Sequence, residues 1–109
     1  MNNILQYPDG DYSERNEVLA VGTSNVLVSR QPVNRRRKNI TITNTSAGAQ
    51  KITIFKGIGV ATAGAGIVIQ PTGSWTDSTV NPAALCYQGT ISVISDAVAG
   101  QISISEEME

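Results

Sequence analysis

The sequence predicts an all-β protein: a single small β-sandwich or jelly-roll of seven or eight short antiparallel strands, with an extended N-terminal arm. In several segments apolar residues alternate strictly with polar ones, as they do in strands that bury one face. These segments recur at roughly ten-residue spacing and are separated by turn residues, a pattern typical of sandwiches and barrels. The 109 residues suffice for one domain of this kind.

The composition agrees with this fold class. The chain is 40% apolar but only 5% aromatic, and it contains 10 glycines. Small β-branched side chains must therefore fill the core, which favours strands over helices. The charged fraction of 16% is too low for a long disordered chain.

Residues 1–17 form the predicted arm and residues 18–109 the predicted sandwich. The arm is polar and has a tight turn at Pro8-Asp9-Gly10. Short apolar strands are expected over residues 17–22 and 25–29. Next comes "NITITN", whose Ile40 and Ile42 should point into the core. We expect it to form a hairpin across the turn 46–49 with "QKITIF", whose Ile52 and Ile54 should also point inward.

The second half begins with a Gly/Ala-rich hairpin loop, residues 56–66, which leads into a strand over 67–70 and a turn at 71–73. Trp75 follows in the next short strand, as a core or edge plug. Residues 78–85 are expected to form an irregular crossing segment between two strands. Residues 86–95 and 101–107 are expected to pair as the last two strands, and the edge strands of so small a sandwich invite pairing with another chain.

Charge is strongly segregated along the chain. Residues 1–17 carry four carboxylates and one arginine, residues 18–76 carry seven cations and no acid, and residues 77–109 carry five carboxylates and no cation. The core of the basic region is a run of four cations, Arg35, Arg36, Arg37 and Lys38. This run could dock on an acidic protein neighbour, be merely solvated, or contact nucleic acid. Alternatively, the strands fold all these charges into one mixed surface.

The residue inventory argues against an enzyme, a cofactor or a metal site. The chain has no histidine, which excludes Ser-His-Asp and Cys-His catalysis, and its one cysteine, Cys86, cannot form a Cys-only zinc site. "GIGVAT" begins like a dinucleotide fingerprint, but Thr62 stands at the third glycine position and a strand follows it. Because we see neither an apolar membrane span nor a secretory signal, we expect synthesis in a cytoplasm.

Three stretches of the chain resemble small virion proteins of tailed bacteriophages: "RRKNITITNTSAGAQKITIF", "GIGVATAGAGIVIQPTGSW" and "YQGTISVISDAVAGQISISEE". The shared pattern is a basic residue before an I-x-I-x-N strand, a glycine-containing loop, an I-x-I-x-P-x-G turn and a Y-x-G-x-I strand. The resemblance covers about two-thirds of the chain and implies a β-sandwich attached to a particle. The N-terminal arm has no counterpart in it.

From this resemblance we expect a capsid decoration or cement protein, located in the virion, that binds the major capsid protein or another virion protein. A homotrimer is expected on the same basis. The residues expected to contact partners are the basic run and three apolar residues of the arm: Arg35, Arg36, Arg37, Lys38, Ile4, Leu5 and Tyr7. The alternative is a tail- or fibre-associated receptor- or carbohydrate-binding module, for which Trp75 and Tyr87 are the candidate aromatic pair.

Overall fold

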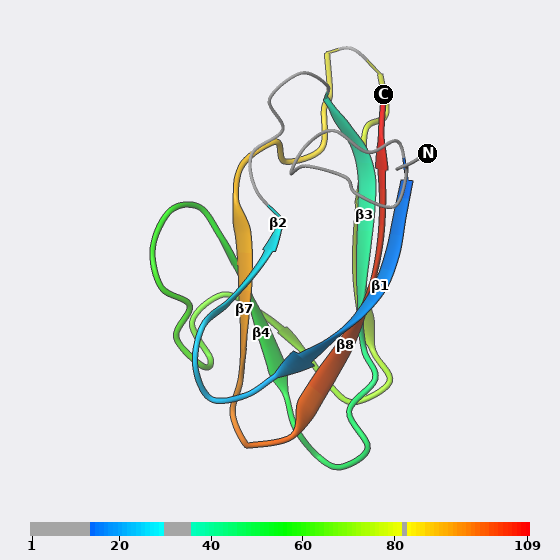
Figure 1. Ribbon diagram of the computed structural model, residues 1–109. Coiled ribbons are helices and arrows are strands. Elements are labelled where there is room, and N and C mark those ends of the chain that lie inside the picture. Colours follow the sequence, from blue (N-terminus) through cyan, green and yellow to red (C-terminus); the bar gives the residue numbers. More distant parts are fainter. Residues whose placement is uncertain (1–13, 30–35, 82) are drawn as a thin grey trace, which may run out of the picture.

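The computed structural model describes residues 14–29, 36–81 and 83–109, and in these residues the secondary structure is all-β. Eight strands form two facing antiparallel sheets of four strands each (Figure 1). The strands are β1 (Glu14–Val21), β2 (Val26–Ser29), β3 (Arg37–Asn44), β4 (Ile52–Lys56), β5 (Ile67–Ile69), β6 (Ser74–Ser78), β7 (Ile91–Ser95) and β8 (Gly100–Met108). No helix of the described residues is long and apolar enough to span a bilayer.

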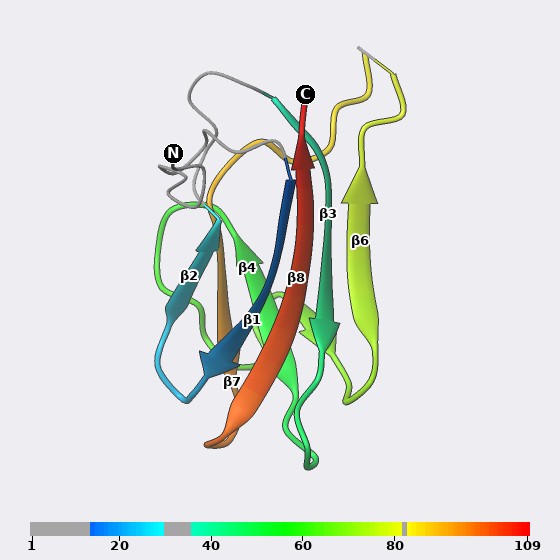
Figure 2. The same cartoon turned by 45° about the vertical axis from the view of Figure 1, so that its right-hand side comes forward.

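The order of the strands defines the topology. Sheet A has the order β1-β8-β3-β6 and sheet B the order β2-β7-β4-β5. Figure 2 shows the four strands of sheet A side by side in front of sheet B. Only the β4–β5 connection stays within one sheet, and every other connection passes from one sheet to the other. This is the arrangement of an eight-stranded jelly roll, so the predicted fold class is confirmed.

The core lies between the sheets and consists of isoleucine and valine. Ile40 and Ile42 of β3 and Ile52 and Ile54 of β4 are all buried in it, as their alternation predicted. Trp75 packs against this cluster from the edge strand β6 and is half-buried, which confirms its expected role as a plug. Burial of these side chains is the main force holding the two sheets together.

Two predicted strand pairings are wrong. β3 and β4 do not form a hairpin, because β3 pairs with β8 and β6 whereas β4 pairs with β7 and β5. The last two strands, β7 and β8, likewise lie in opposite sheets. Alternation shows which face of a strand is buried, but it does not identify the neighbouring strand. In both places the chain uses its short connection to cross the core.

The boundary of the arm also differs from the prediction. β1 begins at Glu14, and residues 14–17 pair with residues 104–107 of β8. These four residues therefore belong to the sandwich and not to an arm. Residues 1–13, which include Ile4, Leu5 and Tyr7, lie outside the described residues.

Candidate interaction surfaces

The basic run lies where β3 begins, beside the C-terminal end of β8. Arg36 is exposed, and its Nη2 lies 2.8 Å from Oε1 of Glu109. Lys38 is exposed too, with its Nζ 3.8 Å from Oε2 of Glu107. Both cations therefore face carboxylates of their own chain. Arg35 lies outside the described residues.

Arg37 takes the opposite direction and is fully buried, at 0% exposure. Strict alternation from Ile40 and Ile42 would turn Arg37 toward solvent. A β-bulge between Arg37 and Asn39 adds one residue to β3 and reverses the alternation. As a result Arg37 lies opposite Met108, and both side chains point into the sandwich.

Inside, the Arg37 guanidinium binds a buried carboxylate. Its Nε donates to Oε2 of Glu106 at 2.7 Å, and its Nη2 donates to Oγ of Ser29 at 2.8 Å. The Ser29 hydroxyl in turn donates to the same Glu106 oxygen at 2.6 Å. Nη1 donates to the carbonyl oxygens of Tyr87 and Gly89. Arg37 thereby links β2, β3, β8 and the segment before β7.

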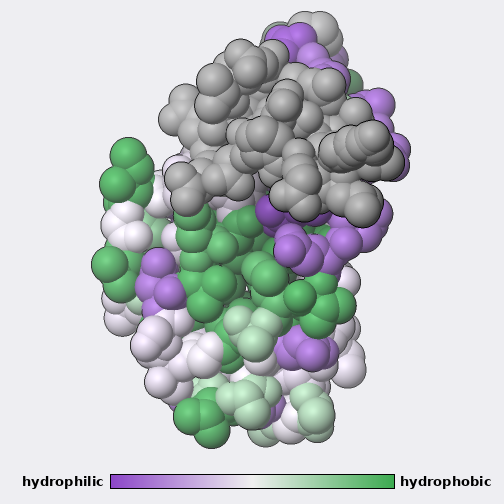
Figure 3. All heavy atoms as spheres, viewed as in Figure 1, coloured by the Kyte–Doolittle hydropathy of each residue, from purple (hydrophilic) through white to green (hydrophobic). Residues whose placement is uncertain are grey.

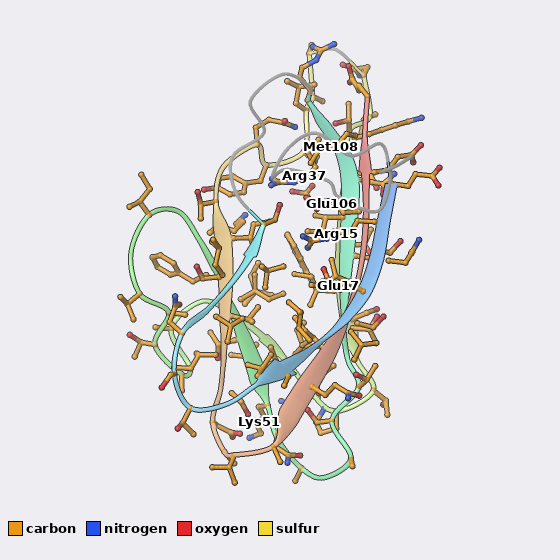
Figure 4. All side chains as sticks on the ribbon, in the orientation of Figure 1. Arg15, Glu17, Arg37, Lys51, Glu106 and Met108 are labelled. Atoms are coloured by element: carbon orange, nitrogen blue, oxygen red, sulfur yellow. The ribbon has the colours of Figure 1, made fainter. Side chains whose placement is uncertain are left out.

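Arg15 of β1 completes this cluster from the other side. Its Nε lies 3.7 Å from Oε1 of Glu106, and its Nη2 donates to the Val28 carbonyl at 2.7 Å. Figure 4 shows Arg15, Arg37 and Glu106 converging between the sheets at the end where β8 terminates. We expected Arg37 to contact a partner, but its complete burial within this cluster rules that out.

The acidic C-terminal strand therefore meets the basic run within one molecule. Glu106, Glu107 and Glu109 pair with Arg37, Lys38 and Arg36. Among the described residues, the strands thus fold these acidic and basic side chains together, which is the alternative that the sequence left open. Glu106 was missed as a partner of the basic run, although Ile102, Ile104, Glu106 and Met108 continue one inward alternation that could have revealed it.

The four edge strands of the described sandwich are each protected against strand addition. β1 carries Arg15 and Glu17 on its inward side, and β6 carries Asp77 there. β2 is four residues long and has an irregularity between Leu27 and Ser29, and β5 has three residues. Inward charges, bulges and short length all disfavour pairing with another chain. The faces and loops are therefore better candidates for contacts than the edges.

The outer face of sheet A is rich in hydroxyl groups. Thr41, Thr76 and Ser105 are cross-strand neighbours on it, and the hydroxyls of Thr41 and Thr76 lie 3.0 Å apart. Thr43, Ser74 and Ser103 form a second row of the same kind. Small hydroxyl side chains that bond to one another are well hydrated and give this face little apolar surface to bury against a partner.

Sheet B has a different outer face, because the β4–β5 loop, residues 57–66, folds over it. Three outward-facing residues, Thr53, Ser92 and Ile94, are consequently buried. The loop exposes Ile58 at 95% and Val60 at 72%. In Figure 3 apolar side chains protrude over this loop, at the left of the molecule. From the sequence we considered this loop only as a hairpin connection and a partial dinucleotide fingerprint, and not as an exposed apolar segment.

The aromatic pair considered for carbohydrate binding does not form a platform. Trp75 lies on β6 of sheet A, whereas Tyr87 lies in the segment before β7 of sheet B. Both pack against the core cluster and are half-buried. Nζ of Lys56 lies 5.6 Å from the centroid of the Tyr87 ring, in a cation–π arrangement.

Cys86 is buried in the described structure. Its exposure is 4%, and its thiol donates to the Arg37 carbonyl oxygen at 3.2 Å. We expect a thiol reagent such as DTNB to react with Cys86 at least about 100-fold more slowly in the native protein than in urea. Rapid labelling of the native protein would contradict this burial. No cluster of possible metal ligands occurs among the described residues.

Comparison with known proteins adds little to this picture. No protein-family model matches the chain, and no curated protein matches it significantly. Among solved structures, the crystal structure of PirA is similar to it, with a TM-score of 0.43 and 15% identity, over 98% of this chain and 100% of that chain. A likeness at this level indicates no function.

Proposed function

We propose that this chain is a structural protein of a tailed-phage virion, a capsid decoration or cement protein that binds the head surface and stabilises the shell. The observation that carries the proposal is the contrast between a sandwich with protected edges and a loop that exposes Ile58 and Val60 close together. Contiguous exposed apolar side chains on a small domain are typical of protein contact sites.

The resemblance to phage virion proteins supports the same proposal, because its motif residues have identifiable structural roles in a jelly roll. Asn44 of the I-x-I-x-N strand fixes the crossing from sheet A to sheet B. Gly73 of the P-x-G turn accepts a hydrogen bond from the Asn44 backbone N–H. An added Cβ at Gly89 of the Y-x-G segment would collide with Oη of Tyr87. The pattern thus describes how a sandwich of this kind is closed at its ends.

The proposal is tested on particles produced from the genome that encodes the chain. We expect the protein in purified virions by mass spectrometry, and gold-labelled antibodies against it on the heads. Particles that lack it should release their DNA at a lower temperature, because a cement protein adds contacts across the shell. Labelling of tails or fibres instead would favour the receptor-binding alternative, and absence from purified particles would refute both.

The proposed homotrimer is tested separately in solution. Light scattering after size exclusion should give three times the chain mass of 11.5 kDa for the full-length protein. Because several protomers bound to one particle act together, trimerisation would strengthen a weak individual contact. A monomer at micromolar concentration would contradict the trimer but would leave the location in the virion open.

A further inference from the structure

The loop of residues 57–66 is held against sheet B by three hydrogen bonds, although it contains four glycines. The Ala61 N–H donates to Oδ1 of Asn25 at 2.8 Å, and the Ala61 side chain is buried. The Gly64 N–H donates to the Thr53 hydroxyl at 2.9 Å, and the Gly57 N–H donates to the Thr90 carbonyl at 2.8 Å. These three bonds anchor the loop at its start, middle and end. Its exposed tip is therefore preorganised, so binding through it costs little conformational entropy.

The glycines on either side of Ile58 give the tip its shape. Gly57 and Gly59 have φ values of 126° and 146°, which side-chain-bearing residues rarely adopt. A Cβ at Gly59 would also lie 3.3 Å from the Phe55 ring. The backbone thus turns sharply around Ile58 and leaves its side chain 95% exposed. A rigid convex anchor of this kind fits a concave apolar pocket.

The charge around the tip is of one sign. Residues 25–29, 52–69 and 91–95 make up the strands of sheet B and its covering loop, and they contain Lys56 but no aspartate or glutamate. Lys56 is exposed at the base of the loop. A partner that matches this surface therefore presents an apolar pocket for Ile58 and Val60 and a carboxylate opposite Lys56.

We propose that this loop docks into such a pocket on a different protein of the particle, an inference that rests on the proposed function and names its contact surface. A twofold contact with a second copy of the chain fits less well, because the same face of that copy supplies no carboxylate for Lys56. A lipid surface also fits less well, since membrane-binding loops use aromatic side chains at the interface, and the exposed residues of this loop are isoleucine, valine, alanine, threonine and glycine.

The test uses particles assembled without this protein, to which purified full-length variants are added. In the main variant Ile58→Ser is combined with Val60→Ser. We expect its affinity for the particles to fall about 10- to 100-fold, as is typical when a central apolar anchor is removed. Val98→Ser is the matched control, since Val98 is as exposed as Val60, at 72%, but lies in the β7–β8 turn. It should bind like the wild type.

Lys56→Gln tests the charge in the same assay. It should lower affinity about 3- to 10-fold at low salt and reduce the salt dependence of binding. Lys51→Gln serves as its control, because Lys51 is also exposed but stands just before the start of β4, whereas Lys56 is the last residue of that strand. Figure 4 shows Lys51 at the end of the sandwich away from the Arg37 cluster. Equal effects of the two lysine variants would contradict a specific carboxylate opposite Lys56.

The outcomes separate this inference from the function on which it rests. If the wild type does not bind particles at all, the proposed function fails. If the wild type and the Ile58/Val60 variant bind equally, the function stands and the loop is not the contact surface. Vesicles containing phosphatidylglycerol provide a final comparison. Loop-dependent binding to these vesicles, with none to particles, would overturn the protein partner in favour of a lipid one.

Discussion

Replacing Glu106 by glutamine is expected to lower the free energy of unfolding by about 3–5 kcal/mol. Glu106 is 1% exposed and supplies the carboxylate that faces both Arg37 and Arg15. The substitution keeps the size of the side chain and removes its charge. It removes the negative charge that faces the buried Arg37 guanidinium at 2.7 Å, where little water is present to replace it. A small domain is stable by only about 5–15 kcal/mol, so this loss is a large fraction of the total.

Urea unfolding of two further variants distinguishes the charge from the simple loss of a side chain. Glu107→Gln is the matched control, since Glu107 is the next residue but pairs with the exposed Lys38 at 3.8 Å. It should cost less than about 1 kcal/mol. The double variant Arg37→Met, Glu106→Leu removes this ion pair and should recover part of the loss, because apolar residues can replace a buried ion pair. Recovery is incomplete because Arg15 still loses Glu106 and the Tyr87 and Gly89 carbonyls lose the Arg37 donors. A cost for Glu106→Gln no larger than that of Glu107→Gln would contradict the argument.

The Arg37 cluster also shows where sequence reasoning reaches its limit. Period-2 alternation correctly placed Ile40, Ile42, Ile52 and Ile54 in the core, because each strand has one buried face. The same rule misplaced Arg37, because one extra residue at the bulge reverses the alternation. A bulge adds a residue without changing the residue types around it. Only the register of β3 with its partner strand β8 reveals the bulge.

Strand pairing could not be predicted for a related reason. The turns at residues 45–51 and 96–99 are short enough for hairpins, and hairpins are the most local solution for two consecutive strands. In this fold both turns cross the core instead. β8 then lies between β1 and β3, so the sheet pairs strands from the two ends of the sequence. Local patterns contain no information about such a distant neighbour.

The exposed loop was missed because its sequence is ambiguous. "GIGVATAGAG" predicts a hairpin loop, and β4 and β5 do form that hairpin. Whether its isoleucine and valine are buried or exposed depends on how the loop folds over sheet B. The buried residue is Ala61, whereas the larger Ile58 and Val60 are exposed. Hydrophobicity alone would have predicted the reverse.

The second large effect is expected at Asn44, where alanine should lower the free energy of unfolding by about 3 kcal/mol. Asn44 is 0% exposed, and its Nδ2 donates to the Gln50 carbonyl at 2.8 Å and to the Ile69 carbonyl at 3.0 Å. Its Oδ1 accepts from the Ser46 N–H at 3.0 Å. One side chain thus satisfies three backbone groups, from the β3–β4 crossing and the end of β5. Removing it leaves these groups without partners where water has little access.

Asn39→Ala is the control for this prediction, because Asn39 lies on the same strand and is only half-buried. Its side chain donates one hydrogen bond, to Oε1 of Glu107 at 3.0 Å, so its loss should cost about 1 kcal/mol or less. The two variants are compared by urea unfolding and by amide hydrogen exchange. In Asn44→Ala the N–H of Ser46 should exchange faster than in the wild type, while the N–H groups of β3 and β8 at the opposite end should keep their relative protection. Equal costs for the two asparagines would mean that the last residue of the I-x-I-x-N strand does not hold the crossing between the sheets.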